Sequence, residues 1–117
     1  MKEIEIIAEA MLDKKAKNVC ALDLRNVDGA SSITDHLVIC NADSAPAVIA
    51  ISDNIEEQME RKCNRKLKRM QGRENAFWII LDYFDIVVHV FQTEHRNFYR
   101  LEDMWADGVR TNFEEQQ

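Results

Sequence analysis

The chain has 117 residues but only three glycines and one proline, and it contains no long apolar run. Scarce glycine and proline argue against disorder over most of the chain. A membrane-spanning helix needs about 20 predominantly apolar residues, so we expect no membrane partner. Residues 1–11 alternate acidic and apolar side chains and lack the apolar stretch of a signal peptide. The composition therefore predicts one folded domain with a single core.

Cysteine is also scarce, and it offers no metal or redox motif. Cys20, Cys40 and Cys63 are an odd number, widely spaced, with no C-x-x-C pair among them. This spacing excludes a zinc knuckle and a thioredoxin-type redox pair. A secreted protein of this size would usually carry an even set of disulfides. We therefore expect a cytoplasmic protein in which the cysteines are small buried hydrophobes.

Charge is unevenly distributed along the chain. Fifteen Lys and Arg stand against 21 Asp and Glu, for a net charge of −6. Residues 61–73 hold seven of the basic residues and no acid, which leaves a net −13 on the rest. We call residues 61–73 the basic strip. It is either a solvated helix end with an edge strand or a site that contacts RNA, although no aromatic residue lies within it for base stacking. Its candidate RNA contacts are Arg65, Lys66, Lys68 and Arg69.

Hydrophobic periodicity predicts three helices and five strands. The predicted helices cover residues 3–17, 44–63 and 93 to about 104 or 105, and the predicted strands cover 19–27, 33–41, 65–70, 77–82 and 85–91. The order α-β-β-α-β-β-β-α indicates one α/β domain, a mixed and mostly five-stranded sheet with helices packed on it. Residues 1–105 form this domain, and the acidic segment 106–117 is predicted to be a flexible tail.

Enzymatic motifs are absent from the chain. It has no G-x-S-x-G elbow and no glycine-rich phosphate loop, so no cofactor is expected. A metal-dependent nucleotidyl- or phosphoryl-transfer enzyme remains an alternative, with Asp82 and Asp85 as ligands and Asp23 or Asp35 as a further one. Eight aromatic residues between positions 77 and 105 are more than a domain of this size easily buries. Their density favours a protein interface.

Two segments together resemble a known family. Residues 22–41 read LDLRNVDGASSITDHLVICN, and a further pattern runs from Gly72 through Trp78 and LDYFDIVVHVF to Trp105. This ordered set is similar to that of the ribosomal silencing factor family, also called the Iojap family. The resemblance implies a nucleotidyltransferase-like outline without catalytic residues, so the protein is expected not to be an enzyme.

The resemblance also implies a partner and a mechanism. Such proteins bind the large ribosomal subunit through its fourteenth protein, block joining of the small subunit and lower translation when nutrients are limiting. Two further expectations come from the residues themselves: the basic strip leaves room for a secondary contact with rRNA, and exposed strand edges and aromatics favour a homodimer of the free protein. One departure from the family pattern is Phe84, which stands where glycine is usual in the hairpin turn. The partner-binding residues carried over by position are Trp78, Asp82, Tyr83, Asp85 and His89, with Tyr99, Leu101, Met104 and Trp105 from the last helix.

Overall fold

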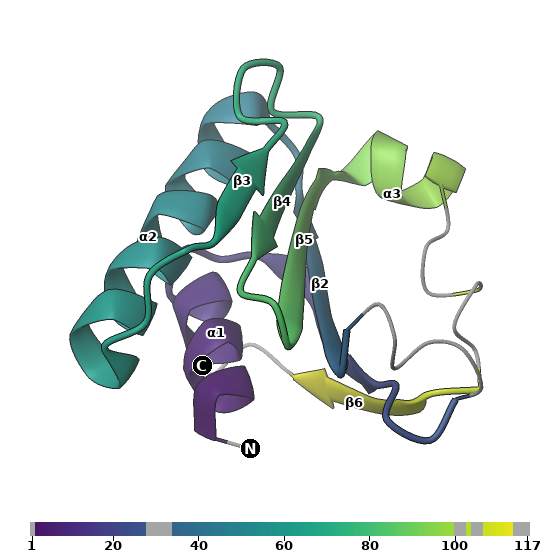
Figure 1. The fold of residues 1–117 in the computed structure, drawn as a ribbon. Helices are drawn as coiled ribbons and strands as arrows, with labels where there is room; N and C mark the ends of the chain where they lie inside the picture. The colour runs from purple at the N-terminus through teal and green to yellow at the C-terminus, as the bar shows by residue number, and fades with distance from the viewer. Residues whose placement is uncertain (1, 28–33, 100–102, 104–106, 114–117) are drawn as a thin grey trace.

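A computed structural model of the chain describes residues 2–27, 34–99, 103 and 107–113 (Figure 1). Three helices and six strands lie within these ranges, joined by turns and loops. Their bounds are α1 Lys2–Asp13, β1 Lys17–Asp23, β2 His36–Ala42, α2 Ala45–Cys63, β3 Arg69–Gln71, β4 Trp78–Asp82, β5 Ile86–Gln92, α3 Thr93–Tyr99 and β6 Val109–Phe113. The predicted order of elements is confirmed as far as α3. Residues 100–102 and 104–106, where the last helix was predicted to continue, lie outside the described residues.

The six strands form one mixed sheet in the order β3-β4-β5-β2-β1-β6. Strands β2 and β5 run parallel, and every other neighbouring pair is antiparallel. The predicted hairpin of β4 and β5 is confirmed. This sheet is the mixed α/β architecture that the sequence predicted.

The predicted count of five strands is wrong, because β6 adds a sixth. Strand β6 lies within the segment 106–117 that was predicted to be a tail, and it pairs with β1 from Val109 to Phe113. Four of its five residues are exposed, so the segment shows none of the apolar alternation that marks a half-buried strand. Backbone pairing to β1 holds it in place. Residues 114–117 lie outside the described part of the chain.

Helix α2 forms as its end signals and its apolar spacing predict. The Ser44 side chain accepts a hydrogen bond from the Ala47 N–H at 3.2 Å, and a proline occupies the first turn. Asn64 closes the helix in the left-handed conformation. The stripe that faces the sheet consists of Val48, Ile51, Ile55 and Met59, all fully buried.

The two faces of the sheet are covered differently. Helices α1 and α2 lie side by side over one face, and α3 lies on the other side (Figure 1). The main core cluster sits under α1 and α2 and includes Ile79, Leu81, Val88 and Val90 of the hairpin. A smaller cluster on the opposite face comprises Cys20, Leu22, Leu24, Leu37, Ile39 and Phe91, with Trp78 and Val87 packed against it.

Backbone conformation at two positions shapes the ends of β4. Gly72 has a φ of +86°, and a Cβ there would lie 2.0 Å from the Trp78 carbonyl oxygen. Only glycine fits that approach. At the other end, Phe84 adopts a φ of +79° in the turn between β4 and β5. A bulky residue rarely takes this conformation, so the turn carries strain at Phe84.

Candidate protein-binding face

Strand alternation sets up one candidate surface on β3, β4 and β5. Successive side chains of a strand point to opposite faces, so Trp78, Ile80 and Asp82 point away from α1 and α2. On β5, Phe91 lies opposite Trp78, His89 opposite Ile80, and Val87 opposite Asp82. On β3, Gln71 pairs with Ile80 and Arg69 pairs with Asp82. We call this surface the outer face, and its residues are Arg69, Gln71, Trp78, Ile80, Asp82 and His89.

Trp78 and His89 form a fixed pair at the centre of the outer face. The Trp78 Nε1–H donates a hydrogen bond to His89 Nδ1 at 2.9 Å, and the indole stacks on Phe91 with ring centroids 4.8 Å apart. Burial lowers the pKa of His89 to about 4. The imidazole is therefore neutral at pH 7, with its proton on Nε2. Because both rings are held in place, the exposed part of the partly buried Trp78 side chain is preorganised for a contact.

Polar groups from β3 and β4 lie beside this aromatic pair. The Asp82 carboxylate accepts the Phe84 N–H at 2.8 Å and lies 4.0 Å from the Arg69 guanidinium. A shallow hollow of about 130 Å³ is lined by Arg69, Gln71, Ile80 and Asp82. The outer face thus offers an aromatic edge, an aliphatic side chain and a small polar depression. Such a surface suits a protein contact better than a reaction.

Two of the residues predicted for partner binding point away from the outer face. Tyr83 is only 2% exposed and belongs to the core, where burial raises the pKa of its hydroxyl. Asp85 accepts a 2.6 Å hydrogen bond from Arg65, which also donates to the Tyr83 carbonyl and to Glu3 of α1. Burial raises the pKa of Asp85, but the Arg65 contact outweighs it and leaves that pKa below its ordinary value. Arg65, predicted as an RNA contact, therefore ties the hairpin to α1.

The predicted contacts from the last helix fall largely beyond what the structure describes. Leu101, Met104 and Trp105 lie outside the described residues, and for Tyr99 only the backbone position in α3 is described. Lys66, Lys68 and Arg69, the remaining predicted RNA contacts, are exposed. Trp78, Asp82 and His89 are thus the predicted partner-binding residues that the fold gathers on the outer face.

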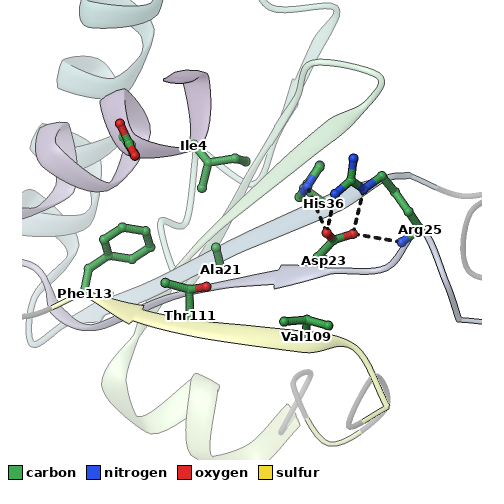
Figure 2. Close-up of a pocket in the computed structure, with 9 residues that line it drawn as sticks. Ile4, Ala21, Asp23, Arg25, His36, Val109, Thr111 and Phe113 are labelled. Atoms are coloured by element: carbon green, nitrogen blue, oxygen red, sulfur yellow. Dashed lines mark hydrogen bonds and ion pairs between the residues drawn. The ribbon is translucent and has the colours of Figure 1, made fainter. Parts of the chain in front are cut away.

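A separate cleft lies between α1 and the strands β1, β2 and β6 (Figure 2). Its volume of about 430 Å³ falls within the range of small-molecule sites. Ile4, Phe113 and Val109 line its apolar part, whereas Asp23 and Arg25 stand at its polar end. Hydrogen bonds from Arg25 hold the pKa of Asp23 at about 2. Asp23 and Arg25, two of the charged residues that line this cleft, therefore already pair with each other.

Three of the four carboxylates named for a metal-dependent enzyme each lie beside a different arginine. Asp23 pairs with Arg25, Asp85 with Arg65, and Asp82 lies near Arg69. Across the described ranges, no group of three or more His, Cys, Asp or Glu side chains is arranged to hold a metal ion. In the same part of the chain, none of the helices is long and apolar enough to cross a membrane.

Comparison with known proteins decides the family. A family model described as "Ribosomal silencing factor during starvation" matches residues 1–117. The ribosomal silencing factor of Bacillus subtilis is 36% identical over 105 residues, which cover 90% of this chain and 86% of that protein. The chain belongs to the ribosomal silencing factor family. Membership indicates a ribosome-associated silencing role and a regulatory protein.

Plant and structural relatives extend the comparison. The chloroplast protein Iojap of Arabidopsis thaliana is 32% identical over 85 residues, which cover 71% of this chain and 35% of that protein. A crystal structure from Bacillus halodurans superposes with a TM-score of 0.76 at 30% identity and covers 97% of each chain. Another from Chromobacterium violaceum gives a TM-score of 0.81 at 24% identity, covering 91% of this chain and 86% of that one. The fold is therefore that of the silencing-factor relatives.

Three residues near the outer face were absent from the predicted site. Ile80 lies between Trp78 and Asp82 in the alternation of β4, so its position on the outer face could be predicted from the sequence. Gln71 joins the face only through the pairing of β3 with β4. Phe84 is 71% exposed in the adjacent turn, and its departure from the family's glycine was the only signal that singled it out.

Proposed function

We propose that this ribosomal silencing factor binds the large ribosomal subunit through the subunit's fourteenth protein and sterically blocks joining of the small subunit. Translation then falls when nutrients are limiting. The mechanism makes and breaks no covalent bond, so it requires only a surface that holds the factor on the intersubunit side. We place that surface on the outer face, and we place the protein in the cytoplasm.

The observation that carries the site assignment is the preorganised Trp78–His89 pair. A partly buried tryptophan fixed by a hydrogen bond and by ring stacking loses little side-chain entropy on binding. Tryptophan is also enriched among the residues that dominate interface energetics. Ile80 and Asp82 beside it supply an apolar contact and a carboxylate that can meet a basic partner.

The charge balance supports a basic protein as the partner. Outside the basic strip the chain has eight basic and 21 acidic residues, a net −13. An acidic surface accelerates encounter with a basic ribosomal protein and raises the association rate most at low salt. Asp82 places one of these negative charges on the outer face, where its reversal can be tested.

A sedimentation experiment tests this function. The tagged protein is expected to travel with free large subunits and not with joined ribosomes on a sucrose gradient. Asp82→Lys is expected to weaken binding to large subunits by about 1–2 kcal/mol, because it reverses a charge facing the partner. Trp78→Phe keeps the stacking on Phe91 but removes the indole, and a similar loss is expected.

Glu9→Lys is the matched control, because Glu9 is exposed on α1, away from the outer face. It applies the same change of charge and should leave binding to large subunits within about 0.5 kcal/mol of wild type. Equal losses for Glu9→Lys and Asp82→Lys would remove the outer face as the site. Absence of any association with large subunits would overturn the proposed function itself.

A further inference from the structure

The turn between β4 and β5 exposes an aromatic ring on a strained backbone. Phe84 is 71% exposed and has a φ of +79°. The Asp82 carboxylate holds this conformation by accepting the Phe84 N–H at 2.8 Å. Folding gains little from the ring, because most of it lies in solvent, and glycine would relieve the strain. A strained and solvent-facing side chain of this kind points to a contact outside the protein.

The fold brings the basic strip to this ring. The Lys68 N–H donates to the Asp82 carbonyl at 2.9 Å, so the strip and the turn lie alongside each other. The Lys68 ammonium lies 4.6 Å from the centroid of the Phe84 ring. The strip contains no aromatic residue of its own, and the tertiary structure supplies one from a distant part of the sequence. An aromatic face flanked by cations is therefore present on the surface.

The charges around Phe84 favour a polyanion. Lys66 and Lys68 have no acidic partner within 4 Å among the described residues. Of the two acidic residues nearest Phe84, Asp85 is engaged by Arg65 and Asp82 lies 4.0 Å from Arg69. Unpaired lysines are available for phosphate contacts. The acidic charge elsewhere on the chain is screened beyond about 8 Å at physiological ionic strength, so it does not cancel this local field.

We propose that Phe84, Lys66, Lys68 and Arg69 form a binding site for single-stranded RNA. One unpaired base stacks on the exposed part of the Phe84 ring, and the three cations contact the flanking phosphates. Base–aromatic stacking tolerates any sequence, because every base has a π-face. The proposal goes beyond the proposed function, since it requires no ribosomal protein and shares only Arg69 with the outer face. It can therefore be tested on the isolated full chain.

Fluorescence anisotropy of a fluorescein-labelled single-stranded RNA of about 12 nucleotides measures this binding. The wild-type chain is expected to bind at low salt and to lose affinity steeply as salt is raised. Phe84→Leu should weaken binding about tenfold without changing the salt dependence, because it removes only the stacking surface. Combined Lys66→Gln and Lys68→Gln should reduce the slope of log affinity against log salt by roughly one to one and a half.

Two controls separate RNA stacking from other effects. Phe84→Gly should raise the thermal midpoint, because it relieves the strained backbone, and it should still weaken RNA binding. Phe77→Leu changes the other phenylalanine that is exposed among the described side chains, which stacks on His95, and should leave RNA binding unchanged.

Three results would overturn the proposal. The first is no binding by the wild-type chain at about 50 mM salt, and the second is an equal loss for Phe77→Leu and Phe84→Leu. The third is a Phe84→Leu variant that keeps its RNA affinity but binds large subunits more weakly, which would make Phe84 a protein contact. The outer-face variants are measured by their binding to large subunits. A negative result with single-stranded RNA would therefore leave the proposed function unaffected.

Discussion

Individual side chains on the outer face are constrained by burial as much as by their partners. His89 is only 7% exposed, although it lies on the side of the sheet away from α1 and α2. Its neutral form accepts the Trp78 hydrogen bond, which protonation of Nδ1 would abolish. The same residue that orients the tryptophan therefore makes the stability of the protein sensitive to acid.

His89 is predicted to destabilise the fold as pH falls. Its folded pKa is about 4, whereas an unfolded histidine titrates near 6.5. Between these two values the unfolded state binds a proton that the folded state does not, so stability falls as pH drops from about 6.5 to 4. The expected loss is roughly 3 kcal/mol, and there is none above about pH 7.

Urea unfolding across this pH range measures the effect in wild type and in His89→Gln. The glutamine oxygen can still accept the indole N–H but does not titrate. The difference in unfolding free energy between the two proteins should therefore change by roughly 3 kcal/mol over the range. Parallel stability curves for the two proteins would show that His89 keeps an ordinary pKa.

At the scale of elements, α3 is attached to the sheet by buried polar groups. Arg96 is 6% exposed, and its guanidinium donates to the Asn18 carbonyl at 2.6 Å and to the Asn41 side chain at 2.9 Å. Thr93 at the start of α3 accepts from Asn41 and donates to Asp43. This network fixes where the last helix begins relative to β1 and β2.

Arg96→Met is expected to destabilise the protein by at least about 2 kcal/mol. Methionine fills much of the same space but removes the donors to the Asn18 carbonyl and to the buried side chain of Asn41. Urea unfolding measures the loss, and hydrogen exchange should show α3 opening more readily than α2. Glu94→Ala, an exposed change on the same helix, should stay within about 0.5 kcal/mol of wild type. A similarly small effect of Arg96→Met would mean that α3 does not depend on this network.

The whole molecule is held together by strands that serve both core clusters. Strands β1, β2 and β5 each contribute side chains to the main cluster and to the smaller one. If these strands separated, the apolar side chains of both clusters would be exposed to water. The two layers are therefore one cooperative unit.

Unfolding is accordingly predicted to be two-state. Tryptophan fluorescence reports on Trp78 among others, and far-UV circular dichroism reports on the helices of the opposite layer. The two signals should give coincident urea transitions with one midpoint. If the tryptophan signal changed at distinctly lower urea than the helical signal, the layers would be separate units and the argument from shared strands would fail.

The sequence predicted the α2 helix and the β4–β5 hairpin because each carries a local signal. Helix α2 has a capping serine and an apolar stripe, and the hairpin strands are rich in β-branched and aromatic residues. Trp78, Asp82 and His89 were predicted by position from the family resemblance, and the pairing of β4 with β5 brings them to one face. Strand β6 carries no such pattern, because edge pairing to β1 needs only backbone groups.

The sequence alone determined the family, the α/β class and the main buried surfaces, since these depend on residue types at fixed local spacings. Only the tertiary structure decided which polar residues are engaged by other residues of the protein and are therefore not available to a partner. Arg65 and Asp85 looked like surface charges but pair with each other, and Tyr83 is core. The fold also set Phe84 against Lys68. Contacts between residues distant in sequence depend on strand register and burial, which local spacing does not specify.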